Sequence, residues 1–381
     1  MASDRRKTRR IAALTLASVL ASGTLAACGS NGTSAASGPV AGTVSSGTAA
    51  EIVAKYSRSP LTLRLAQTPL KTKPTGKVID EVEYPGPTAE EFGNAVTAAC
   101  AALGCTVKRI PMGLTPSSMA AAWNQAVQDH PAAVISAAVT KLMIGSQLAR
   151  LKAAGVPVVT VLSDATAPAD VAAALAGPSV SNFGGGLAAD WIAANAQASK
   201  TTAHVLAYSY PDLPFMSGWA AAFTSELKRT CPGCDVIMKG YTAASAAQFP
   251  SQVVSDLQAN PDVNYIAMAS GQMMSGVPQV LSAAGLTSKV KIITKAGTNL
   301  NFELLKAGTY QQADIGFSMD MYAWGAVDAV ARILAGQGNN LPTYDATEIL
   351  TPSNINFNPA TTNSWSIQGY QAMFKKSWGV K

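Results

Sequence analysis

From Lys77 onward, short continuous apolar runs alternate with longer segments whose apolar residues recur every three or four positions. The first run covers 78–82 and predicts a buried strand. Thr88 and Glu91 after it match the capping box that begins a helix, and Gly104 matches the glycine that ends one. This stretch therefore predicts a strand followed by a helix.

The same alternation continues to a long helix predicted over 320–334. Further strands are predicted at 133–137, 156–162, 204–208, 235–238, 265–269, 290–294 and 313–317. Continuous apolar strands separated by helices are typical of parallel sheets that helices cover on both faces. Because the alternation occurs as two sets, we predict an α/β fold with two doubly wound parallel-sheet lobes.

The first 28 residues have the layout of an export signal. A cluster of arginines and one lysine precedes an apolar run over 11–20, and small residues lead to Cys28. The run is shorter than the ~20 apolar residues that a membrane-spanning helix needs. Leu25-Ala-Ala-Cys28 resembles the lipobox of bacterial lipoproteins, which implies that Cys28 becomes the new N-terminus and carries a lipid. The alternative is an ordinary signal peptide with a chance cysteine.

The export signal also explains the basic charge of the chain. Residues 1–27 hold five basic residues and one acidic residue, so they account for four of the six formal positive charges. The remainder is close to neutral, which argues against a nucleic-acid partner. Residues 29–50 are small and polar with no charge, and such a segment is expected to be a flexible tether.

The four cysteines after Cys28 fall into two close pairs, Cys100 with Cys105 and Cys231 with Cys234. Export permits disulfides, and closeness favours the local pairing among the three possible connectivities. The Cys-Pro-Gly-Cys segment could also be a redox motif or half of a zinc site. We favour a structural disulfide, because no second such motif occurs and the chain has only two histidines.

Catalytic motifs are missing from the sequence. It contains no nucleophile elbow, zinc-protease motif, Walker loop or dinucleotide fingerprint. Gly184-Gly-Gly186 is compatible with a phosphate in principle, but its context favours a tight turn between the lobes. We therefore expect a binding protein without catalytic residues, metal or cofactor.

Five segments resemble one protein family in order and spacing. They are Leu151–Thr160, Asn260–Tyr265, Ala283–Gly285, Leu305–Gly308 and Gly325–Ala329. The family is that of the solute-binding lipoproteins of ABC importers, specifically the ribose-binding-like sugar group of type I periplasmic binding proteins. The resemblance spans about Lys77 to Gly336. It implies two lobes joined by a hinge that the chain crosses several times.

The resemblance also implies a function and partners. A small-molecule ligand would bind between the lobes, and ABC permease subunits would receive it. The protein would be a monomer at the outer face of the cytoplasmic membrane or in the periplasm, held to the membrane only by its lipid anchor. Two alternatives are a sensor lipoprotein that presents its bound form to a receptor, and an exported enzyme.

Most polar positions that contact sugar in the family carry other residue types here. The expected carboxylates, amides and glutamine are replaced by Leu162, Ser270, Ala296 and Phe317 or by their neighbours. Since desolvated sugar hydroxyls need paired donors and acceptors, the substitutions predict a ligand less polar than a simple pentose or hexose. The predicted ligand-binding residues are Tyr84, Ser163, Asp164, Phe215, Trp219, Tyr241, Ser270, Lys295 and Phe317.

Several of these candidates have an alternative. Tyr241 could cover the hinge, and Phe317 could pack in it. Trp219 shares helical spacing with Phe223 and Leu227, which favours core packing. Lys295 follows a strand and is either a solvated charge or a group that holds an anion.

The predicted domain organisation follows from these elements. Residues 1–27 are the signal peptide, and 28–75 are the lipidated cysteine, the tether and an arm. The N-terminal lobe is 76–180 plus 317–338, and the C-terminal lobe is 181–316 plus 339–381. The chain is expected to cross between lobes near 178–184, 313–317 and 336–342, where glycine, proline and asparagine are frequent.

Replacement of Cys28 tests the lipid anchor. If Cys28 carries the lipid, Cys28→Ala leaves the chain without an acylation site, and the protein should move from the membrane fraction to the soluble fraction. Fractionation of cells followed by immunoblotting measures this. An unchanged distribution would contradict the anchor, and Cys231→Ala serves as the control because it should not alter the distribution.

Overall fold

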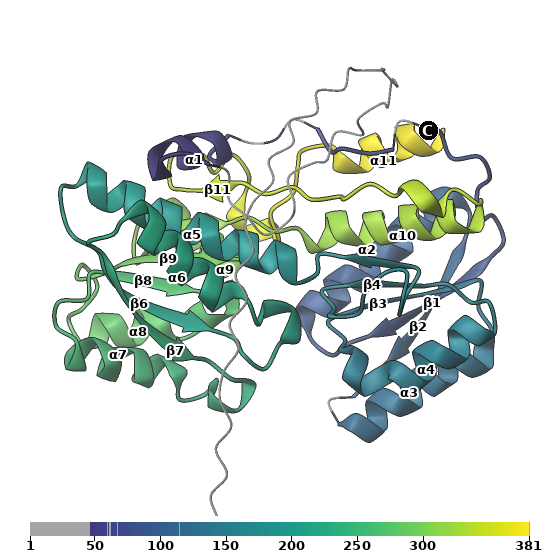
Figure 1. Ribbon diagram of the computed structural model, residues 1–381, viewed down its shortest axis with the longest axis horizontal. Helices are drawn as coiled ribbons and strands as arrows, with labels where there is room; N and C mark the ends of the chain where they lie inside the picture. Colours follow the sequence, from purple (N-terminus) through teal and green to yellow (C-terminus); the bar gives the residue numbers. More distant parts are fainter. Residues whose placement is uncertain (1–45, 59, 61, 67, 114, 381) are drawn as a thin grey trace, which may run out of the picture. The chain divides into compact units, whose positions relative to one another are not determined.

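The computed structural model describes residues 46–58, 60, 62–66, 68–113 and 115–380. The predicted signal peptide and Cys28 lie outside the described residues. The described part forms two parallel-dominated sheets with helices packed on them (Figure 1). The predicted fold class, two doubly wound α/β lobes, is confirmed. Within the described ranges, no helix has the length and apolar character needed to span a membrane.

The first sheet is parallel throughout, with strand order β2-β1-β3-β4-β5. Helices α2 (Pro87–Leu103) and α10 (Met319–Leu334) pack together on one face, and α3 (Pro116–Asp129) and α4 (Lys141–Ala153) pack together on the other (Figure 1). Its strands are β1 (Val78–Glu83), β2 (Thr106–Pro111), β3 (Ala133–Ala137), β4 (Val158–Val161) and β5 (Ala173–Leu175).

The second sheet has the order β11-β10-β9-β8-β6-β7, and only β11 is antiparallel to its neighbour. Its strands are β6 (His204–Ser209), β7 (Asp235–Gly240), β8 (Tyr265–Met268), β9 (Lys291–Lys295), β10 (Gln311–Ile315) and β11 (Ile349–Leu350). Its helices are α5 (Pro178–Ala198), α6 (Trp219–Thr230), α7 (Phe249–Ala259), α8 (Val277–Ala283) and α9 (Asn299–Ala307). Helix α1 (Ala49–Tyr56) packs on α5.

The apolar runs became strands because both faces of each sheet are covered. Val134 and Ile135 in β3, and Ile292 and Ile293 in β9, are fully buried although successive residues point to opposite faces. The edge strand β2 is partly exposed, so it carries no continuous apolar run. That is why the apolar pattern did not reveal it.

The helix after β1 begins differently from the prediction. Gly86 is the N-cap and Pro87 the first helical residue, so Thr88 lies inside the helix and makes no capping bond. The capping-box prediction was wrong, because proline at the first position already sets the helical backbone. The predicted end is confirmed, since Gly104 adopts a left-handed φ of 78°.

The glycine run Gly184–Gly186 is part of α5 and does not form the predicted turn. A Cβ at Gly185 would lie 2.8 Å from the carbonyl oxygen of Trp219 in α6. The glycines therefore allow α5 and α6 to approach closely. Close helix packing, rather than a backbone turn, is the physical reason for the run.

Both predicted cysteine pairings are confirmed. Cys100 and Cys105 lie at disulfide distance with their Cα atoms 5.0 Å apart, and Cys231 and Cys234 do so with their Cα atoms 5.3 Å apart. The first pair links the end of α2 to the start of β2. The second links the end of α6 to β7. Each disulfide therefore closes a helix-to-strand connection.

The chain passes from one sheet to the other between β5 and α5, again at 316–318 between β10 and α10, and again between α10 and β11. The last helix, α11 (Tyr370–Trp378), packs on α10 and α2. The predicted lobe boundaries stay a prediction. Because α11 packs on helices of the first sheet, its residues, at the end of segment 339–381, are better assigned to the N-terminal lobe.

A buried ion pair in α10 joins distant parts of the chain. The Asp328 carboxylate has no exposed surface and pairs with Arg332 at 2.9 Å. It also accepts hydrogen bonds of 2.6 Å from the Tyr344 hydroxyl and from Nε1 of Trp378. Arg332 in turn donates to the carbonyl oxygen of Thr68 at 3.0 Å. This network holds the N-terminal arm, the segment after α10 and α11 against one helix.

Removal of Asp328 should strongly destabilise the fold. Asp328→Ala leaves the Arg332 charge buried without its partner, which typically costs about 3–5 kcal/mol of unfolding free energy. Urea unfolding monitored by tryptophan fluorescence measures this loss. The exposed Asp262 serves as the control, since Asp262→Ala should change stability by less than about 0.5 kcal/mol. Equal stability of both variants would show that the network is not needed for folding.

Candidate functional site

Each sheet has one point at which the strand order reverses. The chain moves from β1 outward to β2 and then back past β1 to β3, and it does the same around β6 with β7 and β8. Open α/β sheets bind ligands beyond the carboxyl ends of the strands at such points. Tyr84 directly follows β1, and Tyr210 directly follows β6. The topology thus places one tyrosine at each reversal point.

Tyr210 belongs to an aromatic group of the second lobe, and Tyr84 interacts with it electrostatically. Burial raises the pKa of Tyr210 to about 12, and the neighbouring Tyr241, Asp212 and Tyr84 add to the shift. The rings of Tyr210 and Tyr241 meet edge to face with centroids 4.8 Å apart, and Tyr241 meets Phe249 at 4.9 Å. Tyr84 of the first lobe is therefore near an aromatic series of the second lobe.

A hydrogen bond also links the two sheets at the edges where the carboxyl ends of their strands lie. Gln272 lies in a short 3-10 helix (Gly271–Met274) after β8, and its side-chain amide donates to the Thr88 hydroxyl in α2 at 3.3 Å. Both residues lie at the carboxyl ends of their sheets. The two edges therefore face each other.

Several strand ends carry residues in an unusual backbone conformation, among them the ends of β3, β4 and β9. Ala138, Leu162 and Ala296 follow β3, β4 and β9 with φ values of 57°, 53° and 56°. Positive φ is uncommon outside glycine, and such residues occur often at functional sites. The amide of each donates to the neighbouring strand, at distances of 2.9 to 3.0 Å. The strand ends that border the site are thus held in a fixed geometry.

Lys295 ends β9 as a buried cation. Its side chain is 6% exposed, and burial lowers its pKa to about 8 although the charge of Asp314 opposes the shift. Its Nζ atom lies 4.6 Å from the ring centroid of Phe317, which stacks on Tyr322 at 4.9 Å. Because Phe317 lies on the crossing to α10, the lysine lies where the chain passes between the sheets.

Ser163 and Asp164 have partners within the first lobe. Ser163 is buried, and its hydroxyl accepts a hydrogen bond from the Ala165 amide at 3.1 Å. The Asp164 carboxylate accepts one from the Lys141 amide, at the start of α4, at 2.7 Å. Ser270 is partly buried between β8 and the following 3-10 helix. All three lie at strand ends, and their ligand contacts stay predictions.

Phe215 and Trp219 belong to the core of the second lobe. Phe215 lies in the 3-10 helix Pro214–Met216, which packs on α5, and it is 7% exposed. Trp219 is fully buried and stacks on Phe223 with centroids 5.1 Å apart. This placement corresponds to the core-packing alternative for Trp219. Within the part of the chain that the structure describes, neither Phe215 nor Trp219 has a ring contact with Tyr84.

The sequence interpretation did not identify Tyr210, Thr88 and Gln272. Tyr210 follows a predicted strand, so the strand-reversal rule would have found it had the strand order been known. Thr88 was assigned to a helix cap, and Gln272 carries no motif. Their roles depend on which strands are neighbours, and the apolar pattern does not give this.

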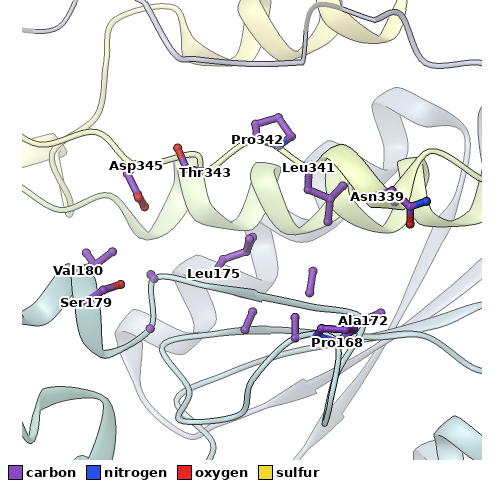
Figure 2. Close-up of a pocket in the computed structure, with 16 residues that line it drawn as sticks. Pro168, Ala172, Leu175, Ser179, Val180, Asn339, Leu341, Pro342, Thr343 and Asp345 are labelled. Carbon is purple, nitrogen blue, oxygen red and sulfur yellow. The ribbon is translucent and has the colours of Figure 1, made fainter. Parts of the chain in front are cut away.

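Figure 2 shows a cavity that Tyr210, Thr88 and Gln272 do not line. It has a volume of about 740 Å³ and lies between β5 and the segment 338–345. Figure 2 shows Leu175 and Leu341 among its labelled lining residues. None of the predicted ligand-binding residues lines it. In the described ranges, no group of three or more histidine, cysteine, aspartate or glutamate side chains is arranged to hold a metal ion.

Comparison with known proteins gives the family. Residues 84–338, more than half of the chain, match the family described as periplasmic binding protein domain, so the chain belongs to this family. A search of curated proteins found no match. The resemblance stated from the sequence is therefore confirmed at the level of family and fold.

Solved structures share the fold at low sequence identity. An ABC sugar transporter subunit from Rhodobacter sphaeroides is 20% identical with a TM-score of 0.63, covering 74% of this chain and 100% of its own. An ABC transporter solute-binding protein from Agrobacterium vitis bound with α-D-tagatopyranose is 17% identical with a TM-score of 0.64, covering 77% and 100%. A 5-methylthioribose transporter solute-binding protein from Thermotoga lettingae is 15% identical with a TM-score of 0.64, covering 81% and 99%.

Loss of the Thr88–Gln272 bond should loosen the contact between the lobes. Thr88→Val keeps the shape of the side chain but removes its acceptor, and one such bond contributes about 0.5–1.5 kcal/mol. We expect a shift of about two- to tenfold towards open forms. Small-angle scattering without ligand should show a larger radius of gyration. Thr97 bonds only within α2, so Thr97→Val is the control. Identical curves for both variants would rule out this link.

Proposed function

We propose that this chain captures a small solute between its two lobes outside the cytoplasmic membrane and delivers it to the permease subunits of an ABC importer. The observation that carries the proposal is that the two strand-reversal points face each other, joined by the Thr88–Gln272 bond and lined by Tyr84 and Tyr210. Family membership supports a solute-binding role with ABC permease subunits as partners.

The proposed ligand is less polar than a free pentose or hexose. Tyr84, Tyr210 and Tyr241 supply aromatic surface at the facing edges. Ser163 and Asp164 already accept hydrogen bonds from backbone amides. They therefore have fewer free lone pairs to accept hydrogen bonds from the hydroxyl groups of a solute. Aromatic side chains with few polar groups are typical of sites for apolar small molecules. A carbohydrate derivative is the second candidate, since similar structures are described with tagatopyranose and 5-methylthioribose.

We further propose that Cys28 anchors the protein to the membrane through a lipid. Its lipobox-like sequence and the uncharged segment 29–50 support this assignment. The two lobes would then remain close to the permease while they exchange solute.

A solute screen combined with scattering tests the capture mechanism. Sugars, polyols, aromatic acids and steroid-like compounds are compared by their effect on thermal unfolding, and each hit is measured by calorimetry. We expect a hit to reduce the radius of gyration, because closure excludes water from the site. Tyr84→Ala and Tyr210→Ala should each weaken binding about tenfold, since ring contacts contribute about 0.5–1.5 kcal/mol beyond area burial.

The control is Leu142→Ala, which removes an almost fully exposed side chain on α4 and should bind as the unchanged protein does. A bound solute that leaves the radius of gyration unchanged would contradict the capture mechanism. Unaltered affinity in both tyrosine variants would contradict the site.

A further inference from the structure

The Lys295 ammonium has no hydrogen-bond acceptor among the residues that the structure describes. Its side chain is 6% exposed, and the contacts of the group are the face of the Phe317 ring at 4.6 Å and the charge of Asp314. An ammonium carries three donors. The Nζ atom of Lys295 is not one of the buried polar atoms without a partner, so it keeps some exposed surface at which its donors remain free. Charged groups held largely out of water are normally hydrogen-bonded.

Asp314 does not supply the missing acceptor. Its carboxylate accepts hydrogen bonds from the Thr294 hydroxyl and from the Gly297 amide, the latter at 3.1 Å. These bonds fix the loop after β9. Asp314 therefore offsets part of the Lys295 charge but takes no hydrogen bond from it.

The packing around Lys295 fixes the position of its ammonium. A Cβ at Gly184 in α5 would lie 2.7 Å from both Cδ and Cε of Lys295, so the lysine stem needs a glycine there. Phe317 covers the ammonium from the crossing that follows β10. The ammonium thus lies at the carboxyl edge of the second sheet, the edge that faces the first lobe.

We propose that the solute is an organic acid whose single carboxylate binds Lys295 and whose apolar body packs on the tyrosines at the facing strand ends. The proposal rests on the proposed capture function and specifies its substrate class. One ammonium balances a single negative charge, and Asp314 already offsets part of it, so a monoanion is repelled less than a dianion such as phosphate. A carboxylate supplies the missing acceptors and forms a charge-assisted hydrogen bond.

Matched pairs of probes test the charge requirement. Phenylacetate and hexanoate are compared by calorimetry with phenylacetamide and hexanamide, which share their shape without the charge, and with D-ribose. We expect at least one acid to bind about tenfold or more tightly than its amide, which corresponds to one charge-assisted hydrogen bond. Equal affinity of acid and amide would contradict the proposal, as would failure of both acids to bind.

Two variants test whether the Lys295 ammonium is the charge that binds the acid, and each variant has a control. Lys295→Met keeps most of the stem without the ammonium, and Gly184→Ala displaces the stem while alanine favours the helix. Each should lower acid affinity about tenfold and leave amide affinity unchanged. The exposed Lys306 gives the charge control, Lys306→Met. Gly145 in α4 has open space around its Cβ and gives the glycine control, Gly145→Ala. Full acid affinity in Lys295→Met would overturn the proposal.

The same measurements separate this proposal from the capture function. A neutral probe that binds tightly and compacts the protein in scattering keeps the capture function and rejects the carboxylate. The opposite result is an acid that binds through Lys295 and leaves the radius of gyration unchanged. That result would support the proposal that a carboxylate binds Lys295 and would contradict closure of the lobes. Circular dichroism spectra of all variants confirm that each is folded before binding is compared.

Discussion

The carboxylate of Asp328, a residue of α10, has no exposed surface. A buried charge is stable only when hydrogen-bond donors surround it. The donors come from Arg332, Tyr344 and Trp378, and Arg332 extends the network to Thr68. These residues lie far apart in the sequence. The need to pair one charge therefore determines where the N-terminal arm, the segment after α10 and the last helix pack.

This constraint has a consequence for the site. Tyr344 lies on the stretch that leads from α10 back to the second sheet, so its bond to Asp328 fixes part of a crossing between the lobes. The crossing at 316–318 carries Phe317, which covers Lys295. Both crossings thus connect the packing of α10 to the edge at which the proposed solute binds. A closing motion would be confined to the short segments between these fixed points.

The backbone at the strand ends of the site is constrained. Ala138, Leu162 and Ala296 hold left-handed backbone conformations, and the amide of each remains bonded to a neighbouring strand. Such conformations are costly for residues with a side chain and persist only when the surrounding structure enforces them. The backbone at the proposed binding edge is therefore preorganised. Lys295 lies between Thr294 and Ala296 and is held by the same constrained backbone.

The sequence by itself determined the buried central strands, most of the helices and the family, but not the edge strand β2. Buried strands such as β3 and β9 are continuous apolar runs because both faces are covered. Helix ends such as Gly104 are readable because few residues accept a left-handed backbone. The cysteine pairs were predictable from their closeness. These features depend on neighbours in the sequence, which is why local pattern reveals them.

Only the tertiary structure decided which of these residues meet. The pairing of Thr88 with Gln272 and the packing of Gly184 against Lys295 join residues far apart along the chain. The sequence suggested a helix cap for Thr88 and a turn for the glycine run, because local pattern carries no strand order. Among the residues that the structure describes, none accepts a hydrogen bond from the Lys295 ammonium, since Asp314 bonds to Thr294 and Gly297. Only the folded arrangement of the two strands determines that.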